Sequence, residues 1–424
     1  MKTINNTKYG ETYIEETLDN GLNVVIWEKK GYATTTCLFG TPYGSLDIKQ
    51  IDEDKNIITY PAGSAHFLEH KLFESENGDI LSEFTNLGAS VNAFTSFNET
   101  VYYFNTTSKD IKKPLELLLD FVQDLKITDE SVEKEKGIIK QELSMYLDQP
   151  NYRLYFETLK SLYYNHPLKI DVGGTHESVD ATTKKDLEEC YNRNYHPSNM
   201  HLVIVSSIDK NKLLKIVKEN QSKKSFSKFK KLTRHIEKEP ESVYRKDFNI
   251  KLNVRNFKTS YAIKLLPSNM DSKNLIKEKW CTYFILESYF SGLNSKYQSW
   301  IKKQEISSFF RYEENITKDA SFIIFYDEGI APDKFKNFVS NQLEKFKESK
   351  ISSEQLELLK KSCFGNTLRK LNYPNEIGTS HFRNIQKNTT IFEQLNIIQS
   401  ITIEDCNKLI ESLDLNNSCT VSIS

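Results

Sequence analysis

Hydrophobic and polar residues alternate in several short segments of the first half of the chain, and this alternation predicts β-strands. Leu22–Trp27 and Ala33–Leu38 form a first pair of such segments, and Ser90–Ser96 and Val101–Thr106 form a second pair. The apolar run Met200–Ser206 predicts a further strand. The first half therefore has enough strand-forming segments to build a sheet.

Apolar residues at helical spacing predict helices between these strands. The run PAGSAHFLEH opens one helix, and Ser64 is placed to be its N-cap because a serine oxygen can accept from the amides of a first turn. Further helices of the first half are predicted at Asp79–Leu87, Pro114–Lys126, Asp129–Tyr146, Tyr152–Tyr164 and Thr183–Tyr191. The second half has predicted strands at Ser321–Tyr326 and Cys419–Ile423 and predicted helices at Asp333–Ser349, Ser353–Leu371 and Thr402–Leu413. This mixture indicates an α+β protein.

A basic and polar stretch separates the two halves. Residues 222–231 read SKKSFSKFKK, and a polar composition continues to Arg245 with Pro240 inside it, which is typical of a linker. We therefore expect a first domain at residues 1–215, a linker at 216–245 and a second domain of similar fold at 246–424. Each domain is expected to be an antiparallel sheet with helices packed on one side.

Composition and charge narrow the class of protein. The 424 residues include 57 basic and 58 acidic side chains, so the net charge of −1 favours neither nucleic acid nor an anionic membrane as a partner. Phe226 and Phe229 lie among the linker lysines, which leaves a local binding patch as an alternative to a solvated linker. Six scattered cysteines, a polar N-terminal segment and the lack of an apolar run of ~18–20 residues predict a cytoplasmic protein without a membrane span.

The sharpest chemical feature is the pentapeptide His66-Phe67-Leu68-Glu69-His70. Two histidines four residues apart lie on one face of a helix, and that spacing lets both imidazoles bind one zinc ion. Glu69 shares the face and is placed to take a proton from a water molecule on the metal. The order H-x-x-E-H is that of the inverzincin motif. The alternative is an ordinary helix face on which two of the eight histidines happen to fall four apart.

A catalytic zinc usually has three protein ligands, so a third is needed from another segment. The predicted helix near residues 132–146 carries Glu135 and Glu142, which are seven residues apart and therefore lie on one face. A solvated charged face explains the same spacing. The composition of this helix does not select Glu142 over its neighbours.

Four segments in order resemble the pitrilysin/insulinase family of zinc peptidases. They are GSAHFLEHKLFES, GASVNAFTSFNETVYYFN, EKEKGIIKQEL and GGTHESVDATTKKDLEECYNRNYHPSNMHLVIVSS. The resemblance covers nearly all of residues 10–210 and, more weakly, the second half, and the short bacterial members are most alike. It implies two α+β domains of similar fold, the second without a metal motif.

The resemblance also implies roles for particular residues. His66, His70 and Glu142 match the positions of the zinc ligands, with one zinc per chain, and Glu69 matches the general base. Glu135 matches a second glutamate that lies near the metal and is needed for full activity. Asn92 and Ala93 match the strand whose backbone edge pairs with a peptide substrate. The implied reaction is zinc-dependent hydrolysis of peptides or unfolded segments, either in general or in maturing one ribosomal peptide precursor.

One departure from the family concerns the second half. Complete enzymes of the family carry an Arg and a Tyr seven residues apart there, whereas the matching slots here fall near Ile301 and Ser308. Arg311 and Tyr312 are close by but out of register, and are expected to be surface residues. We therefore expect a partner, either a homologous inactive subunit in a heterodimer or a second copy in a homodimer. The alternative function is a non-catalytic structural subunit of a peptidase-like assembly.

Overall fold

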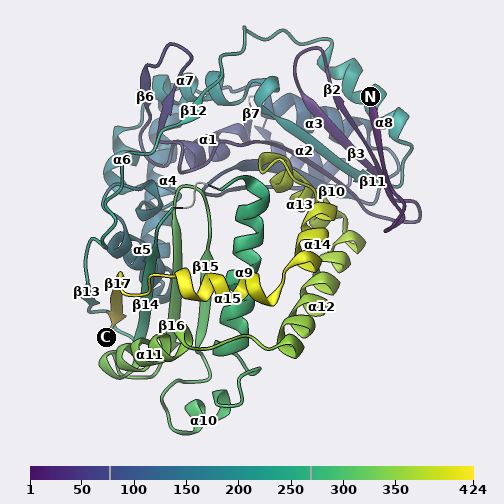
Figure 1. The fold of residues 1–424 in the computed structure, drawn as a ribbon. Coiled ribbons are helices and arrows are strands. Elements are labelled where there is room, and N and C mark those ends of the chain that lie inside the picture. The colour runs from purple at the N-terminus through teal and green to yellow at the C-terminus, as the bar shows by residue number, and fades with distance from the viewer. Residues whose placement is uncertain (76–77, 268–269) are drawn as a thin grey trace. The chain divides into compact units, whose positions relative to one another are not determined.

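The computed structural model describes residues 1–75, 78–267 and 270–424, and its ribbon is drawn in Figure 1. Two compact units divide the chain, and neither is continuous in sequence. The first comprises Met1–Leu143, Ile170–His235 and Lys370–Gln386, and the second comprises Ser144–Lys169, Ile236–Arg369 and Lys387–Ser424. The expected domains at 1–215 and 246–424, with a linker at 216–245, stay a prediction, and each unit includes a segment from the other half of the sequence.

The first unit is built on a seven-stranded sheet with the order β1-β2-β3-β11-β4-β10-β9. Its strands are β1 (Lys2–Asn6), β2 (Glu11–Thr17), β3 (Asn23–Glu28), β4 (Thr35–Thr41), β9 (Ala89–Thr95), β10 (Thr100–Thr106) and β11 (His201–Ser206). Neighbouring strands are antiparallel except β3 and β11, which pair in parallel with Val25 opposite Val203. Strand β9 has only β10 as a neighbour and forms one edge of the sheet.

Helices cover one face of this sheet and enclose the main apolar core. They are α1 (Ser64–Leu72), α2 (Ile80–Asn86), α3 (Lys112–Val122), α4 (Asp129–Leu147), α7 (Lys184–Asn194) and α8 (Lys210–Gln221). Val24, Ile26 and Phe104 point from the strands into this core, where they meet buried helix residues such as Leu68 and Leu118. The intervening strand positions face the other side, as the two-residue repeat of a strand requires.

A helix from the second half of the sequence lies on that other face. Helix α13 (Pro374–Gln386) contacts β11 and β4, and in Figure 1 its yellow-green ribbon lies beside strands of the N-terminal half. Trp27 donates its indole N–H to Nδ1 of His381 at 3.3 Å. A Cβ on Gly378 would lie 2.2 Å from a methyl carbon of Leu38, so the helix approaches the sheet closely. The first sheet is thus covered on both faces.

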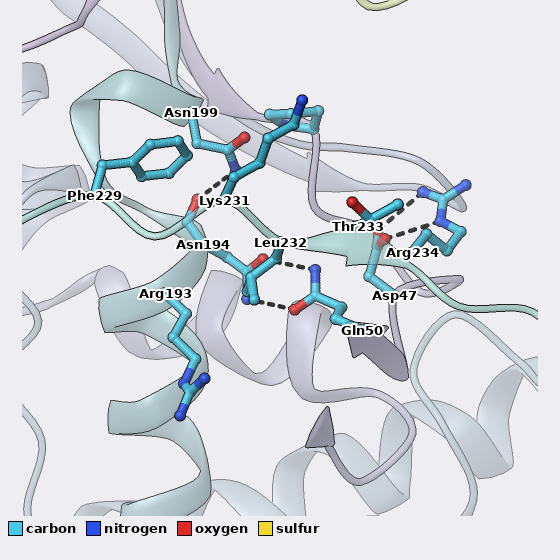
Figure 2. A pocket seen from close by; sticks show the side chains of 11 residues that line it. Asp47, Gln50, Arg193, Asn194, Asn199, Phe229, Lys231, Leu232, Thr233 and Arg234 are labelled. Carbon is cyan, nitrogen blue, oxygen red and sulfur yellow. Dashed lines mark hydrogen bonds and ion pairs between the residues drawn. The ribbon is translucent and has the colours of Figure 1, made fainter. Parts of the chain in front are cut away.

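The stretch expected to be a linker is largely part of the first unit. Residues 216–221 complete α8, and β12 (Thr233–Arg234) pairs with β5 (Lys49–Ile51) in a small sheet that also includes β6 (Ile57–Thr59). The Arg234 guanidinium binds the Asp47 carboxylate through two contacts of 2.8 and 2.9 Å (Figure 2). The basic residues of this stretch therefore include a structural cation that composition did not reveal.

The second unit repeats the arrangement around a five-stranded sheet of order β13-β17-β14-β16-β15. Its strands are β13 (Asp247–Ile250), β14 (Lys258–Leu265), β15 (Arg311–Asn315), β16 (Ser321–Glu328) and β17 (Ser418–Ile423). A core of apolar side chains joins one face to α9 (Ser272–Phe290), α10 (Tyr297–Lys302), α11 (Pro332–Lys347), α12 (Ser353–Arg369), α14 (Ile391–Ser400) and α15 (Ile403–Ser412). Helix α5 (Pro150–Leu162), from the first half, packs on the opposite face, where the hydroxyls of Thr158 and Ser260 lie 2.6 Å apart.

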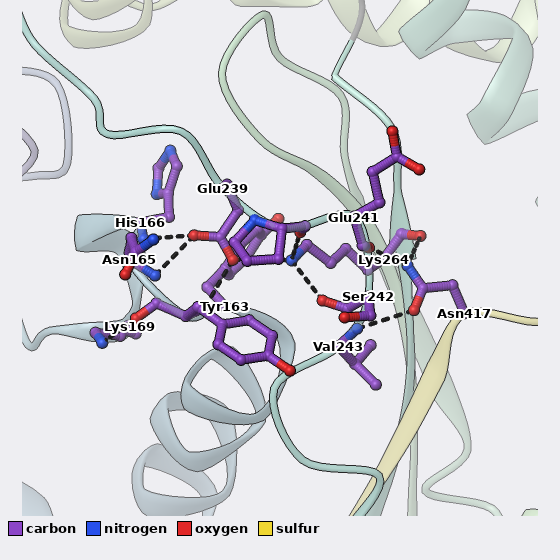
Figure 3. Close-up of polar contacts among 12 residues, drawn as sticks. Tyr163, Asn165, His166, Lys169, Glu239, Glu241, Ser242, Val243, Lys264 and Asn417 are labelled. Carbon is purple, nitrogen blue, oxygen red and sulfur yellow. Dashed lines mark hydrogen bonds and ion pairs between the residues drawn. The ribbon is translucent and has the colours of Figure 1, made fainter.

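A polar cluster around Glu239 holds the beginning of Ile236–Arg369, the longest segment of the second unit (Figure 3). The Glu239 carboxylate accepts from the backbone amides of Tyr164, Asn165 and His166 at 2.6–2.9 Å and from Nζ of Lys264 at 2.9 Å. Burial alone would raise the pKa of Glu239, but Lys264 and these amides outweigh it and lower the pKa. The cluster fixes the chain after α5 against the strand β14.

The predicted fold class is confirmed, because both units are sheets with helices packed on a face. Each sheet is mainly antiparallel with one parallel pair. Two features go beyond the prediction. Each sheet has a helix on its second face, and that helix comes from the other half of the sequence.

Candidate metal centre

Helix α1 begins one residue earlier than expected. Gly63 is its N-cap, with a φ of 89°, and Ser64 is the first helical residue, whose hydroxyl donates to the Pro61 carbonyl at 2.7 Å. The prediction that Ser64 caps the helix was therefore wrong. A left-handed backbone at the cap needs glycine, and a Cβ on Gly63 would lie 2.3 Å from the carbonyl oxygen of Gly173. This close approach of two loops fixes where the helix starts.

The remaining residues of α1 lie on the helix faces that the sequence predicted. Phe67 and Leu68 are fully buried in the core of the first unit. His66, Glu69 and His70 occupy the remaining face, since residues three and four apart in a helix are neighbours. The rings of His66 and His70 have their centroids 4.5 Å apart.

Helix α4 brings Glu142 to the two histidines. Val132, Ile139 and Leu143 bury one side of this helix, which sets the direction of its acidic residues. The Glu142 carboxylate oxygen Oε2 lies 3.8 Å from Nε2 of His66 and 3.5 Å from Nε2 of His70. One ligand atom from each of the three residues lies within 4.8 Å of the others.

These separations fit a zinc ion. Atoms about 2.0–2.1 Å from a tetrahedral zinc lie roughly 3.4 Å from one another, close to the two distances from Glu142 to the imidazoles. Two imidazoles and one carboxylate are a donor set found at catalytic zinc sites, which leave the fourth position open. The structure thus brings together the three residues proposed as ligands.

Glu135 is not one of the three candidate ligands and instead contacts Nδ1 of His70, the ring nitrogen that does not face Glu142. Its carboxylate accepts from Nδ1 of His70 at 2.9 Å, while Nε2 of the same ring faces Glu142. A carboxylate can only accept, so Nδ1 carries the proton and the Nε2 lone pair is available for a metal. Glu135 is 8% exposed, and its predicted catalytic role stays a prediction.

The two imidazoles have opposite protonation preferences. Burial lowers the pKa of His66 to about 4, and the neighbouring His70 adds to the decrease. Burial would also lower the pKa of His70, but hydrogen bonds to Glu135 and Glu142 outweigh it and raise the pKa to about 10. A positive charge between these carboxylates is therefore stabilised, and a divalent cation held there would supply it in place of the proton.

Glu69 is held by the edge strand β9. Thr95 donates its hydroxyl to Oε2 of Glu69 at 2.9 Å, so this contact occupies one of the two carboxylate oxygens. Burial raises the pKa of Glu69, and the hydrogen bond from Thr95 partly opposes the increase. The Thr95 contact is a feature that the spacing of the pentapeptide did not reveal.

Asn92 and Ala93 lie in β9, opposite Tyr103 and Tyr102 of β10. The Ala93 backbone N–H donates to the Asn92 side-chain oxygen at 2.8 Å, so it does not pair with β10 and lies on the open edge of the sheet. Their predicted role in binding substrate stays a prediction, and the open edge is compatible with it.

Arg311 in the second unit is exposed, as expected of a surface residue, whereas Tyr312 is half-buried. Both lie in β15, where the Arg311 guanidinium is over the ring of Tyr326 and the half-buried Tyr312 hydroxyl bonds the Glu287 carboxylate. Ile301 is partly buried against the core of the unit and Ser308 is exposed. Sequence reasoning missed the contacts of Arg311 and Tyr312 because they depend on the register of β15 with β16, which places Tyr326 opposite Arg311, and on the packing of α9, which carries Glu287.

Comparisons with known proteins identify the family. A family model described as Insulinase (Peptidase family M16) matches residues 58–176, and one described as Peptidase M16 inactive domain matches residues 181–363. A Bacillus subtilis relative named as the uncharacterized zinc protease YmfH is 38% identical over 412 residues, which cover 97% of this chain and 96% of YmfH. The chain belongs to the insulinase family of peptidases, family M16.

A solved structure and a second relative agree with this assignment. An M16-like peptidase from Alicyclobacillus acidocaldarius superposes with a TM-score of 0.92 at 31% identity, covering 97% of this chain and 98% of that one. The mitochondrial-processing peptidase subunit beta of Rattus norvegicus is 30% identical over 206 residues, which are 47% of this chain and 40% of the subunit. The resemblance found in the sequence is thus confirmed. Among the described residues, no helix is long and apolar enough to cross a membrane.

Proposed function

We propose that the chain is a zinc-dependent endopeptidase that cleaves peptides or unfolded segments. The observation that carries this proposal is the meeting of His66, His70 and Glu142 within 4.8 Å, with Glu69 on the same helix face. The family assignment supports it, because relatives across the family are named zinc proteases.

Each residue of the site has a part in the reaction. A bound zinc supplies a Lewis acid that polarises the peptide carbonyl and lowers the pKa of its water to about 7. His66, His70 and Glu142 hold one such ion per chain, and Glu135 keeps the His70 ring in the metal-binding tautomer. Glu69 takes the proton from the attacking water and delivers it to the leaving amine. Thr95 holds Glu69 through one carboxylate oxygen while the other receives the proton.

The substrate binds as an added strand on β9. An open sheet edge bonds any extended main chain, so Asn92 and Ala93 contact peptide backbone with little demand on its sequence. The Asn92 side chain covers the Ala93 N–H at 2.8 Å and moves aside when a peptide binds. Such binding selects oligopeptides and unfolded segments, because a folded protein does not present a free extended strand.

The active form includes a second subunit. Ile301 and Ser308 stand where complete family members have the substrate-contacting Arg and Tyr, so a partner supplies these groups. The partner is a homologous inactive chain in a heterodimer, or a second copy in a homodimer. One relative is by its name a subunit of a processing peptidase, which supports this arrangement. The assembly matures a ribosomal peptide precursor or clears peptides in general, in the cytoplasm.

The test is zinc content together with chelator-sensitive cleavage. The protein, purified alone and with the product of a neighbouring gene, should bind one equivalent of zinc and cleave a quenched extended peptide until a chelator is added. Glu69→Gln should abolish cleavage at unchanged zinc content. Glu116→Gln on α3, a carboxylate outside the site, is the control and should cleave normally. Retained cleavage in Glu69→Gln would contradict the role of the base.

The alternative is a non-catalytic subunit with an idle metal site. Its specific prediction is zinc binding without cleavage, whether the chain is alone or joined to its partner. The complete set of ligands and base favours the enzyme.

A further inference from the structure

The tight turn Ser96–Glu99 joins the edge strand β9 to β10, and its backbone is fixed in place. The amide of Ser96 donates to the Glu99 carbonyl at 2.8 Å, which closes the turn. The amide of Ser45 donates to the Ser96 carbonyl at 3.0 Å, and that of Leu46 to the Phe97 carbonyl at 3.0 Å. A Cβ on Gly44 would lie 2.5 Å from the Glu99 nitrogen, so segment 44–46 and the turn are in close contact.

One arginine holds this turn from the basic stretch of the sequence. Arg234 binds both oxygens of Asp47 (Figure 2). It also donates through Nη1 to the Asn98 side-chain oxygen at 2.7 Å. Asp47 in turn accepts from the amide of Gly44 at 2.9 Å. Arg234 therefore ties Asn98 of the turn to the segment on which the turn rests.

A second arginine holds the same turn from α13. Arg383 donates through Nε to the Glu99 carboxylate at 2.7 Å, and Gln386 donates to its other oxygen at 3.1 Å. The Arg383 guanidinium also lies 5.8 Å from the centre of the Phe94 ring in β9. The Glu99 side chain is 5% exposed, so burying its carboxylate would be unfavourable without these two partners.

We infer that Arg234 and Arg383 are positioning residues for the proposed peptidase reaction, acting on the substrate strand and on the base through the turn Ser96–Glu99. The inference rests on the proposed function. Thr95, the last residue of β9, directly precedes the turn and donates to the carboxylate of Glu69. A shift of the turn therefore moves both the strand edge that binds peptide and the hydroxyl that orients the base.

The location of β9 explains why the strand needs this support. An edge strand has hydrogen-bonded neighbours on one side only, and its other side must stay open to accept a substrate. The two arginines bind side chains of the turn at the end of the strand. They come from residues 234 and 383, far apart in the sequence, and both belong to the first unit.

Kinetics on Arg234→Gln and Arg383→Gln test the inference. For a quenched extended peptide we expect kcat/KM to fall roughly 10–100-fold in each, with KM raised and kcat lowered, because both the strand and the base lose their alignment. Zinc content should remain that of the wild type. Arg383→Lys, which keeps the charge, should recover part of the loss.

Hydrogen exchange provides a readout that needs no catalysis. Amides of β9 and β10 should exchange faster in both variants, while β3 and β11 should exchange as in the wild type. Lys29→Gln is the control, since it breaks a largely buried ion pair, 2.6 Å from Glu11, on the β2–β3 side of the sheet. This control should change neither β9 exchange nor the kinetics.

The outcomes separate the two claims. Unchanged β9 exchange, exchange raised evenly over the whole unit, or unchanged kinetics in an active enzyme would each overturn the positioning role. A wild-type protein that binds zinc but never cleaves would overturn the proposed function. The positioning role in the reaction would fall with it, while faster β9 exchange in the variants would still show that the two arginines hold the strand.

Discussion

Replacing Glu135 by glutamine removes the charge behind His70 and keeps the shape of the side chain. In the wild type the Glu135 carboxylate accepts from Nδ1 of His70 at 2.9 Å, and the glutamate is only 8% exposed. The charge polarises the ring and makes Nε2 a stronger donor to a metal. The amide oxygen of the introduced glutamine would still accept from Nδ1, so the tautomer would persist while the polarisation weakened.

The expected magnitude follows from this geometry. Loss of a partner behind a metal-bound histidine typically weakens metal binding 10–100-fold, which is about 1.4–2.7 kcal/mol. Glu135→Gln should lie near the lower figure because it keeps the hydrogen bond. Glu135→Ala should lie near the upper figure because it also leaves Nδ1–H, in a partly buried place, without its acceptor.

Competition with a chromophoric zinc chelator measures the dissociation constant of each variant. Glu133→Gln, on the same helix but 68% exposed, is the matched control and should bind zinc as the wild type does. If Glu135→Gln bound zinc with unchanged affinity and lost only kcat, Glu135 would act on the substrate and the reasoning through His70 would be refuted.

Three further predictions concern stability. Zinc added to the chelated protein at 100 times its Kd should stabilise the first unit by about 2.7 kcal/mol in a calorimetric scan, and a transition insensitive to zinc would contradict the site. Gly63→Ala should lower the free energy of unfolding by about 1–2 kcal/mol or more, because residue 63 has a φ of 89° and the added Cβ would clash with Gly173. An unchanged melting temperature would contradict this and would show that the two loops adapt. Glu239 has a lowered pKa in the folded state. Its contribution to the free energy of unfolding is therefore present above the unfolded pKa of about 4.3 and is lost as the pH falls through the folded pKa. Denaturant unfolding should therefore show Glu239→Gln destabilised at pH 7 and equal to the wild type once the pH lies below the folded pKa of Glu239, and an equal deficit at both would refute this.

Patterns in short stretches of the sequence predicted the two helices that carry the candidate metal ligands. The repeat of apolar residues located α1 and α4, and the spacing of His66, Glu69 and His70 placed all three on one face before any contact was known. The periodicity of α4 did not choose between Glu135 and Glu142. That choice depends on the distance between two helices, which only the packed core determines.

Features that depend on contacts between distant segments could not be predicted from the sequence. The start of α1 is set by Gly63 and Gly173, whose loops are far apart in the chain. Arg234 reads as one cation of a basic linker until its pairing with Asp47 is seen. The exchange of α5 and α13 between the units has no local signal, because an amphipathic helix shows that it packs but does not show on which sheet.

Diffraction at the zinc absorption edge tests the central claim most directly. In crystals of the protein grown with zinc, the account predicts one anomalous peak per chain, about 2.0–2.1 Å from Nε2 of His66, Nε2 of His70 and a carboxylate oxygen of Glu142. A zinc-loaded crystal with no peak between these three side chains, or with its peak at other residues, would contradict the account.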